Sequence, residues 1–179
     1  CDFSDIDKVP NLSVNINKWI YTELIEAKSK IEKNLEDYRF DEAAKNAYQF
    51  AWHSYCDWYL ELSKTILFSD NEEAKTEVRK VSSYVFKQIL ILLHPFIPFV
   101  TEEIWLNNKF DKSGKDFLMH ANWPTGEINK DSSTEQVENI ISIISEIRSF
   151  KNELNVSPGS FIDMSINNIN DNQKDFINN

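Results

Sequence analysis

The stretch from Asp41 to Lys64 constrains the fold of this chain more than any other part of the sequence. Apolar residues recur in it at three- and four-residue spacing, which predicts one amphipathic helix of roughly 36 Å. Large aromatic residues widen the apolar side beyond an ordinary stripe, so we expect neighbouring helices on most sides. The expected inward face comprises Ala44, Ala47, Tyr48, Ala51, Tyr55, Trp58 and Leu62, and a narrow polar seam comprises Glu42, Asn46, Gln49, His53, Asp57 and Lys64.

Helical spacing of apolar residues continues on both sides of this central stretch. Residues 12–38 and 71–93 each sustain the pattern over several turns. Because only Arg39 and Phe40 separate the first helix from the central one, the two should pack antiparallel. The sequence therefore predicts a mainly α protein built as an antiparallel helix bundle. Two more helices are expected to begin at Pro98 and at Ser132, the latter through a capping box with Glu135.

The C-terminal part departs from this pattern. Residues 161–166 (FIDMSI) alternate in polarity, which is typical of a strand, and a lone strand is not stable by itself. We therefore expect a helical-bundle domain over 1–125 and the incomplete start of a small α/β linker unit over 126–179. The region 115–124 is expected to be a short strand or an extended segment that packs on the bundle through Phe117, Met119 and Trp123.

Composition limits the function classes that fit. Hydrophobic residues make up 41% of the 179 residues and aromatic residues 13%, as in a folded protein. The net charge of −10 argues against non-specific nucleic-acid binding by the whole surface, although a small local patch is compatible with it. No apolar run approaches the length of a membrane span, so no membrane partner is expected. Because the chain starts at Cys1, we expect it to be part of a longer protein, and Cys56 is expected to be buried.

Sequence signatures of catalysis are absent. The chain has no phosphate-binding glycine loop, and its three glycines cannot form one. The three histidines are scattered, so no metal site is expected, because zinc needs three or four converging ligands. Glu102 and Glu103 are adjacent and point to different faces of a helix, which makes them unsuitable as a facing acid–base pair. The five tryptophans are expected mostly in the core, with base stacking as the alternative for one or two.

Four segments in order carry a resemblance to a known family. They are CDWYLELSK (56–64), LLHPFIPFVTEEIW (92–105), NWP (122–124) and ISEIRSFKNELNVSPG (144–159). Together they resemble the anticodon-binding helical domain of class I aminoacyl-tRNA synthetases with aliphatic amino-acid substrates, over about residues 19–164. The second segment is shared by the valyl, isoleucyl and leucyl enzymes, whereas EIRSFKNELNVSPG is similar to the valyl enzymes.

The resemblance implies a helix bundle that packs beside the anticodon stem-loop of a valine tRNA. The parent enzyme would use ATP and Mg to join valine to that tRNA in the cytoplasm, and the remainder of its chain would pack against this domain. The catalytic signatures H-I-G-H and K-M-S-K-S are absent here. This chain is therefore expected to have no catalytic residue and no cofactor of its own.

The tRNA contacts implied by the resemblance are assigned to the polar seam and its surroundings. Amide side chains read base edges, and Arg or Lys contacts phosphate. The alternative for each position is a solvated helix face. The candidate tRNA-binding residues are Arg39, Lys45, Asn46, Gln49 and His53, with Lys64, Arg148 and Lys151 as further basic candidates.

Three other interpretations stay open at this stage. The same domain of an isoleucyl enzyme fits the shared motifs, and the upstream catalytic pocket would decide between them. A helical scaffold that binds another protein through an apolar groove fits the acidic charge and the many aromatic residues, and specific tRNA binding would exclude it. A self-contained enzyme is the weakest of the three, because no nucleophile–base pair supports it.

Overall fold

The computed structural model describes residues 8–108, 110, 117–127, 132–157 and 159–160. The chain divides into two compact units, Cys1–Lys130 and Asp131–Asn179. The fold is mainly α, as the sequence predicts, and the predicted strand at 161–166 lies outside the described residues. The helices of the first unit are α1 (Asn15–Glu36), α2 (Phe40–Gln49), η1 (Phe50–Tyr59), α3 (Leu60–Leu67), α4 (Glu72–Leu93), α5 (Pro98–Asn108) and η2 (Leu118–His120), and the second unit contains α6 (Ser132–Glu153).

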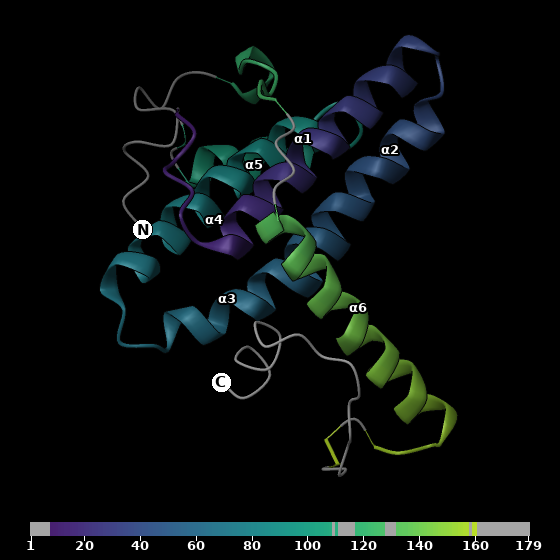
Figure 1. The fold of residues 1–179 in the computed structure, drawn as a ribbon. Coiled ribbons are helices and arrows are strands. Elements are labelled where there is room, and N and C mark those ends of the chain that lie inside the picture. The colour runs from purple at the N-terminus through teal and green to yellow at the C-terminus, as the bar shows by residue number, and fades with distance from the viewer. Residues whose placement is uncertain (1–7, 109, 111–116, 128–131, 158, 161–179) are drawn as a thin grey trace. The chain divides into compact units, whose positions relative to one another are not determined.

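Helices α1 and α2 form an antiparallel hairpin with a tight corner (Figure 1). Tyr38 takes a left-handed backbone conformation there, with φ of 57°. The backbone N–H of Arg39 then donates to the carbonyl oxygen of Asn34 at 2.7 Å, which closes the end of α1. The antiparallel packing predicted from the short link is confirmed, because α1 and α2 lie side by side in opposite directions.

The central helix is continuous from Phe40 to Leu67, but its middle part, η1, is a π-helix with i to i+5 hydrogen bonds. The wider turn lets Phe50 and Tyr55, five residues apart, face the same core. This corrects the predicted inward face, which assumed a regular α-helix and included Tyr48. Tyr48 is exposed, and the buried residues of the helix are Ala43, Ala47, Phe50, Tyr55, Tyr59 and Ser63.

A buried polar network ties η1 to both long helices. The Tyr59 hydroxyl donates to Asn17 Oδ1 at 2.8 Å, and Asn17 Nδ2 donates to Glu77 Oε1 at 2.9 Å. The Glu77 carboxylate also accepts the backbone N–H groups of Ser13 and Val14, each at 2.9 Å. Val14 provides no side-chain cap for α1, so a carboxylate from α4 stabilises the positive end of the α1 dipole instead.

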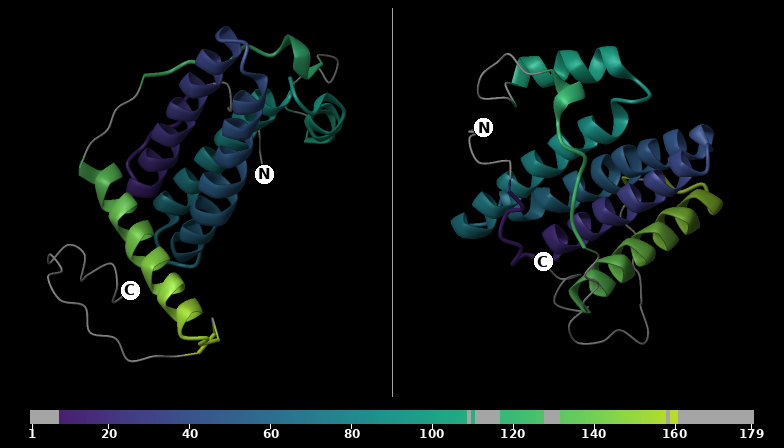
Figure 2. Two further views of the ribbon diagram at one scale, coloured as in Figure 1. Left: turned by 90° about the vertical axis from the view of Figure 1, so that its right-hand side faces the viewer. Right: turned by 90° about the horizontal axis from the view of Figure 1, so that it is seen from above.

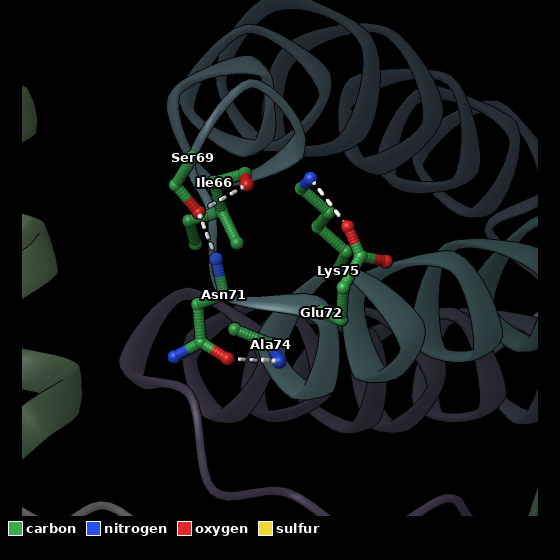
Figure 3. Close-up of polar contacts among 6 residues, drawn as sticks. All are labelled: Ile66, Ser69, Asn71, Glu72, Ala74 and Lys75. Atoms are coloured by element: carbon green, nitrogen blue, oxygen red, sulfur yellow. Dashed lines mark hydrogen bonds and ion pairs between the residues drawn. The ribbon is translucent and has the colours of Figure 1, made fainter.

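The connection from α3 to α4 is fixed by short-range hydrogen bonds (Figure 3). The Ser69 hydroxyl donates to the Ile66 carbonyl oxygen at 2.7 Å and so helps to end α3. Asn71 Oδ1 then accepts the Ala74 backbone N–H at 3.0 Å, which is an N-cap for α4. These local bonds direct α4 back along the central helix, with which it shares the core.

Helix α5 packs on the end of α4 and lies at the margin of the first unit (Figure 2). His94 Nδ1 and Thr101 Oγ1 are 2.8 Å apart, and the Lys87 ammonium lies 5.2 Å from the centre of the Trp105 ring. Glu102 accepts the backbone N–H of Leu118, which joins α5 to η2. Only one face of α5 is thus engaged with described parts of this unit.

The segment after α5 differs from its prediction. Residues 118–120 form a short 3-10 helix where a strand or an extended segment was expected. Leu118 is buried, whereas Phe117 and Met119 are 52% and 69% exposed. Because the helical turn rotates alternate residues outward, the expectation that Phe117 and Met119 pack on the bundle is wrong. The rest of the expected strand falls partly on 115–116, outside the described residues.

Candidate nucleic-acid interface

The solvent side of the central helix carries a continuous row of exposed side chains, which we call the outer face. Its members recur at three- and four-residue spacing along α2 and the first part of η1, so they lie on one side of the helix. They are aromatic, amide, basic and imidazole groups beside one carboxylate and one thiol. The outer face comprises Asp41, Lys45, Tyr48, Gln49, Trp52, His53 and Cys56.

Two aromatic rings form the centre of the outer face. Tyr48 and Trp52 are 60% and 55% exposed. Their rings are parallel to within 3°, with centroids 6.4 Å apart. Side chains four residues apart on a helix are neighbours, and here the pair presents a flat, sequence-tolerant surface on which a nucleotide base can stack.

Charge around the rings is mixed rather than basic. Arg39 and Lys45 both approach Glu42, at 3.8 Å and 3.7 Å, and His53 Nδ1 lies 3.2 Å from Asp57 Oδ2. The carboxylates of Asp41, Glu42 and Asp57 therefore outnumber the two permanent cations here. Stacking and hydrogen bonding, rather than a strong positive field, are what this surface offers a ligand.

The structure brings three of the five candidate residues onto the outer face: Lys45, Gln49 and His53. Asn46 is half-buried, and its Nδ2 donates to the Glu42 carbonyl oxygen at 2.8 Å. Its amide oxygen and the second hydrogen of its amide nitrogen are therefore the groups with which it can reach a ligand. Arg39 precedes α2 at the hairpin corner, and its side chain is exposed.

Sequence reasoning missed Tyr48 as a functional candidate and placed it in the core. The available signal was the i, i+4 spacing of Tyr48 and Trp52 beside Lys45 and Gln49, which sets both aromatics on the polar side. Cys56 was also expected inside but is exposed. Partial burial of the thiol raises its pKa, as does the nearby Asp57, so the thiol is protonated at neutral pH.

The further basic candidates lie elsewhere. Lys64 forms an ion pair with Glu61 at 2.7 Å on α3. Arg148 and Lys151 belong to α6, in the second unit, where Lys151 Nζ donates to the Ser160 carbonyl oxygen at 2.8 Å. Within the first unit, Lys64 is therefore not part of the outer face, and Arg148 and Lys151 belong to the other unit.

Among the described residues, no cluster of histidine, cysteine and carboxylate side chains has the arrangement of a metal centre. None of the described helices combines the length and apolar character needed to cross a membrane.

Comparison with known proteins shows a family match over most of the chain. Residues 17–166 match the anticodon-binding domain of tRNA ligase. The chain is 77% identical to the valine–tRNA ligase of Pelagibacter ubique over 176 residues, 98% of this chain and 20% of that protein. It is 41% identical to that of Rhizobium meliloti, over 86% of this chain and 16% of the relative. The chain thus spans about a fifth or less of the length of these relatives.

Proposed function

Because the chain belongs to the family of anticodon-binding domains of tRNA ligases, we propose that it binds the anticodon stem-loop of valine tRNAs through the outer face. The observation that supports this best is the exposed parallel pair Tyr48 and Trp52, flanked by Gln49 and Lys45. Single-stranded loop bases stack on such rings while amide groups read their edges. The scaffold alternative and the isoleucyl alternative are not favoured, since the relatives compared are valine–tRNA ligases.

Each candidate residue has a role consistent with its position. Gln49, His53 and the amide oxygen of Asn46 contact base edges, and Lys45 and Arg39 contact phosphate. Release of Glu42 from Arg39 or Lys45 accompanies phosphate binding, because Glu42 is three residues from each of the two cations and pairs with both. The specificity of the complex therefore comes from uncharged groups, and a modest part of its affinity comes from charge.

The catalytic steps belong to the rest of the parent polypeptide. We propose that this parent is a cytoplasmic enzyme that joins valine to its tRNA with ATP and Mg, and that its remaining domains pack against this one. The present chain holds the anticodon end of the tRNA. It contributes no catalytic group and no cofactor site of its own to the reaction.

Fluorescence anisotropy with labelled anticodon hairpins tests the proposal. The chain carries a net charge of −10, which repels RNA at long range, so we expect a Kd in the micromolar range or weaker, about −8 kcal/mol or less favourable. A valine anticodon loop should bind more tightly than a scrambled loop. The double substitution Asn46→Ala with Gln49→Ala should reduce this preference more than it reduces total affinity, since neither side chain is charged.

A matched control is available on a neighbouring helix. Asn107 on α5 is exposed, and its side-chain amide donates a hydrogen bond to Glu103 of the same helix. Asn107→Ala should leave both the affinity and the loop preference unchanged. If both loops bind equally and the double substitution changes nothing, the outer face is a solvated surface and the proposal fails.

A further inference from the structure

Helix α5 presents a second exposed surface of a different chemical kind. Of its described residues, Thr101 and Trp105 are buried. Large apolar side chains cover the opposite side, with Phe99 91% exposed, Val100 51% and Leu106 41%, and Ile97 precedes them at 45%. We call these four residues the α5 apolar face. Exposed large apolar residues grouped in one short segment in this way mark an interaction surface.

The apolar face is held rigidly. Thr101 Oγ1 donates to the Ile97 carbonyl oxygen at 3.0 Å and meets His94 Nδ1 at 2.8 Å. On the next residue, Glu102 accepts the Leu118 backbone N–H at 3.1–3.2 Å. A surface fixed in this way loses little conformational entropy when a partner covers it, which favours binding.

The face also contains a recess. A pocket of about 300 Å³ lies against it, lined by His94, Pro98, Phe99, Glu102, Glu103 and Leu106. A recess of this size admits a large apolar side chain, and such anchors carry much of the energy of an interface. Phe99 and Leu106 of the α5 apolar face therefore border a recess in which a partner's side chain can be seated.

Nucleic acid does not fit this surface. Helix α5 contains no Lys or Arg, and Glu103 is exposed beside the apolar side chains. Within α5, a phosphate backbone would meet a carboxylate with no Lys or Arg of the helix to offset it. The α5 apolar face and the outer face of the central helix are thus suited to different partners.

We infer that the α5 apolar face is the surface on which another domain of the same, longer polypeptide docks. The inference rests on the proposed function in that it takes the chain to be part of a ligase. The curated relatives are about five times as long as the stretch that matches, so most of such a protein lies outside this chain. A covalently attached domain has an effective concentration in the millimolar range, far above that of a second copy.

Photo-crosslinking in the full-length ligase polypeptide that contains this chain tests the inference. Phe99→p-benzoylphenylalanine keeps an aromatic group at the centre of the face. Because Phe99 is 91% exposed, the change disturbs no core packing. We expect an intramolecular cross-link to a peptide outside residues 1–179. The matched control is the same substitution at Phe68, which is 86% exposed at the end of α3 and should give no such cross-link.

Every other cross-linking result overturns the inference. A cross-linked dimer would identify a second copy as the occupant, a cross-link within 1–179 would identify this chain itself, and a cross-link to added tRNA would identify RNA. Yield no higher than at Phe68 would mean that the face is uncovered.

Hydroxyl-radical labelling of the unsubstituted full-length protein provides a second measurement if the variant does not fold. Phe99 should react several-fold more slowly in the native protein than in urea, and comparable rates would overturn the inference. Hairpin binding is measured separately on the same preparation. Loss of RNA binding with an intact cross-link would count against the proposed function and not against the docking surface.

Discussion

The two sides of the central helix use the same residue types for opposite purposes. On the inner side, Tyr55 and Tyr59 are buried, and each hydroxyl donates to an atom of α1 or α4. On the outer side, Tyr48 and Trp52 are more than half exposed and stack on each other. The inner aromatics have their interactions within the fold, whereas the outer pair leaves its stacking surface to solvent or to a ligand.

This difference separates stability from function along one helix. Burial raises the pKa of Tyr55 to about 12, so its hydroxyl is protonated and donates to Ser82 at any physiological pH. The inner side is therefore a fixed structural element. Substitutions there should destabilise the fold, and those on the outer side should change RNA binding with little effect on stability.

The largest expected effect is the loss of Tyr59. Tyr59→Ala removes a fully buried ring and the hydroxyl that donates to Asn17 Oδ1. Such a cavity costs about 3–5 kcal/mol of unfolding free energy, measurable by urea titration. The matched outer-side change, Tyr48→Ala, should cost less than about 0.5 kcal/mol, as surface substitutions do. Equal losses would show that the two sides are not distinct.

A smaller effect is expected from Glu77, which belongs to the inner network. Burial by itself raises the pKa of its carboxyl, but hydrogen bonds from Asn17, Ser13 and Val14 outweigh this and hold the pKa below its ordinary value of 4.5. The ionised carboxylate therefore stabilises the fold above pH 4.5, and that stability is lost as the pH falls through the lowered pKa.

Thermal unfolding at decreasing pH measures this contribution. Between about pH 5 and pH 3 the unmodified chain should lose more stability than the Glu77→Gln variant, which has no charge to lose at this position. Glu73→Gln, an exposed position on the same helix, should follow the unmodified chain. Parallel pH profiles for Glu77→Gln and the unmodified chain would contradict the role assigned to the network.

The smallest expected effect concerns charge beside the outer face. Arg39→Ala should weaken binding to every hairpin alike and lower the salt slope of log K by about 0.7–0.9, the value of one phosphate contact. Lys30→Ala removes an equally exposed cation from α1 and should change neither quantity. Loss of loop preference in the Arg39 variant would instead mean that Arg39 reads a base.

Sequence periodicity predicts most of the bundle because helical spacing and turn residues are local signals. Such signals predict that one helix begins at Pro98, that another begins at Ser132, and that a hairpin turns at Arg39. The five-residue spacing of the buried residues Phe50 and Tyr55 does not follow from local signals, since a fixed 3.6-residue period cannot reveal a π-helical segment. This is why Tyr48 was placed inside, whereas Cys56 was expected to be buried because of its residue type.

Long-range contacts explain the remainder. The carboxylate of Glu77 caps a helix that starts about sixty residues earlier, and nothing in either local sequence indicates that pairing. For the candidate site, Gln49 and His53 were predicted in the polar seam with Lys45 beside it, and in the structure all three are exposed on one face of the helix. The aromatic pair between them has an i, i+4 signal in the sequence, but the predicted inward face placed Tyr48 in the core.

The central claim is that the outer face binds an anticodon loop by stacking on its aromatic pair. Anisotropy with a valine anticodon hairpin and the Trp52→Ala variant tests it most directly, beside Trp52→Phe and the exposed control Phe68→Ala. Loss of one stacked base costs about 1–3 kcal/mol, or roughly 5- to 150-fold in Kd. We expect that loss in Trp52→Ala with unchanged unfolding free energy, near-complete recovery in Trp52→Phe, and no change in Phe68→Ala. Unchanged affinity in Trp52→Ala would contradict the claim.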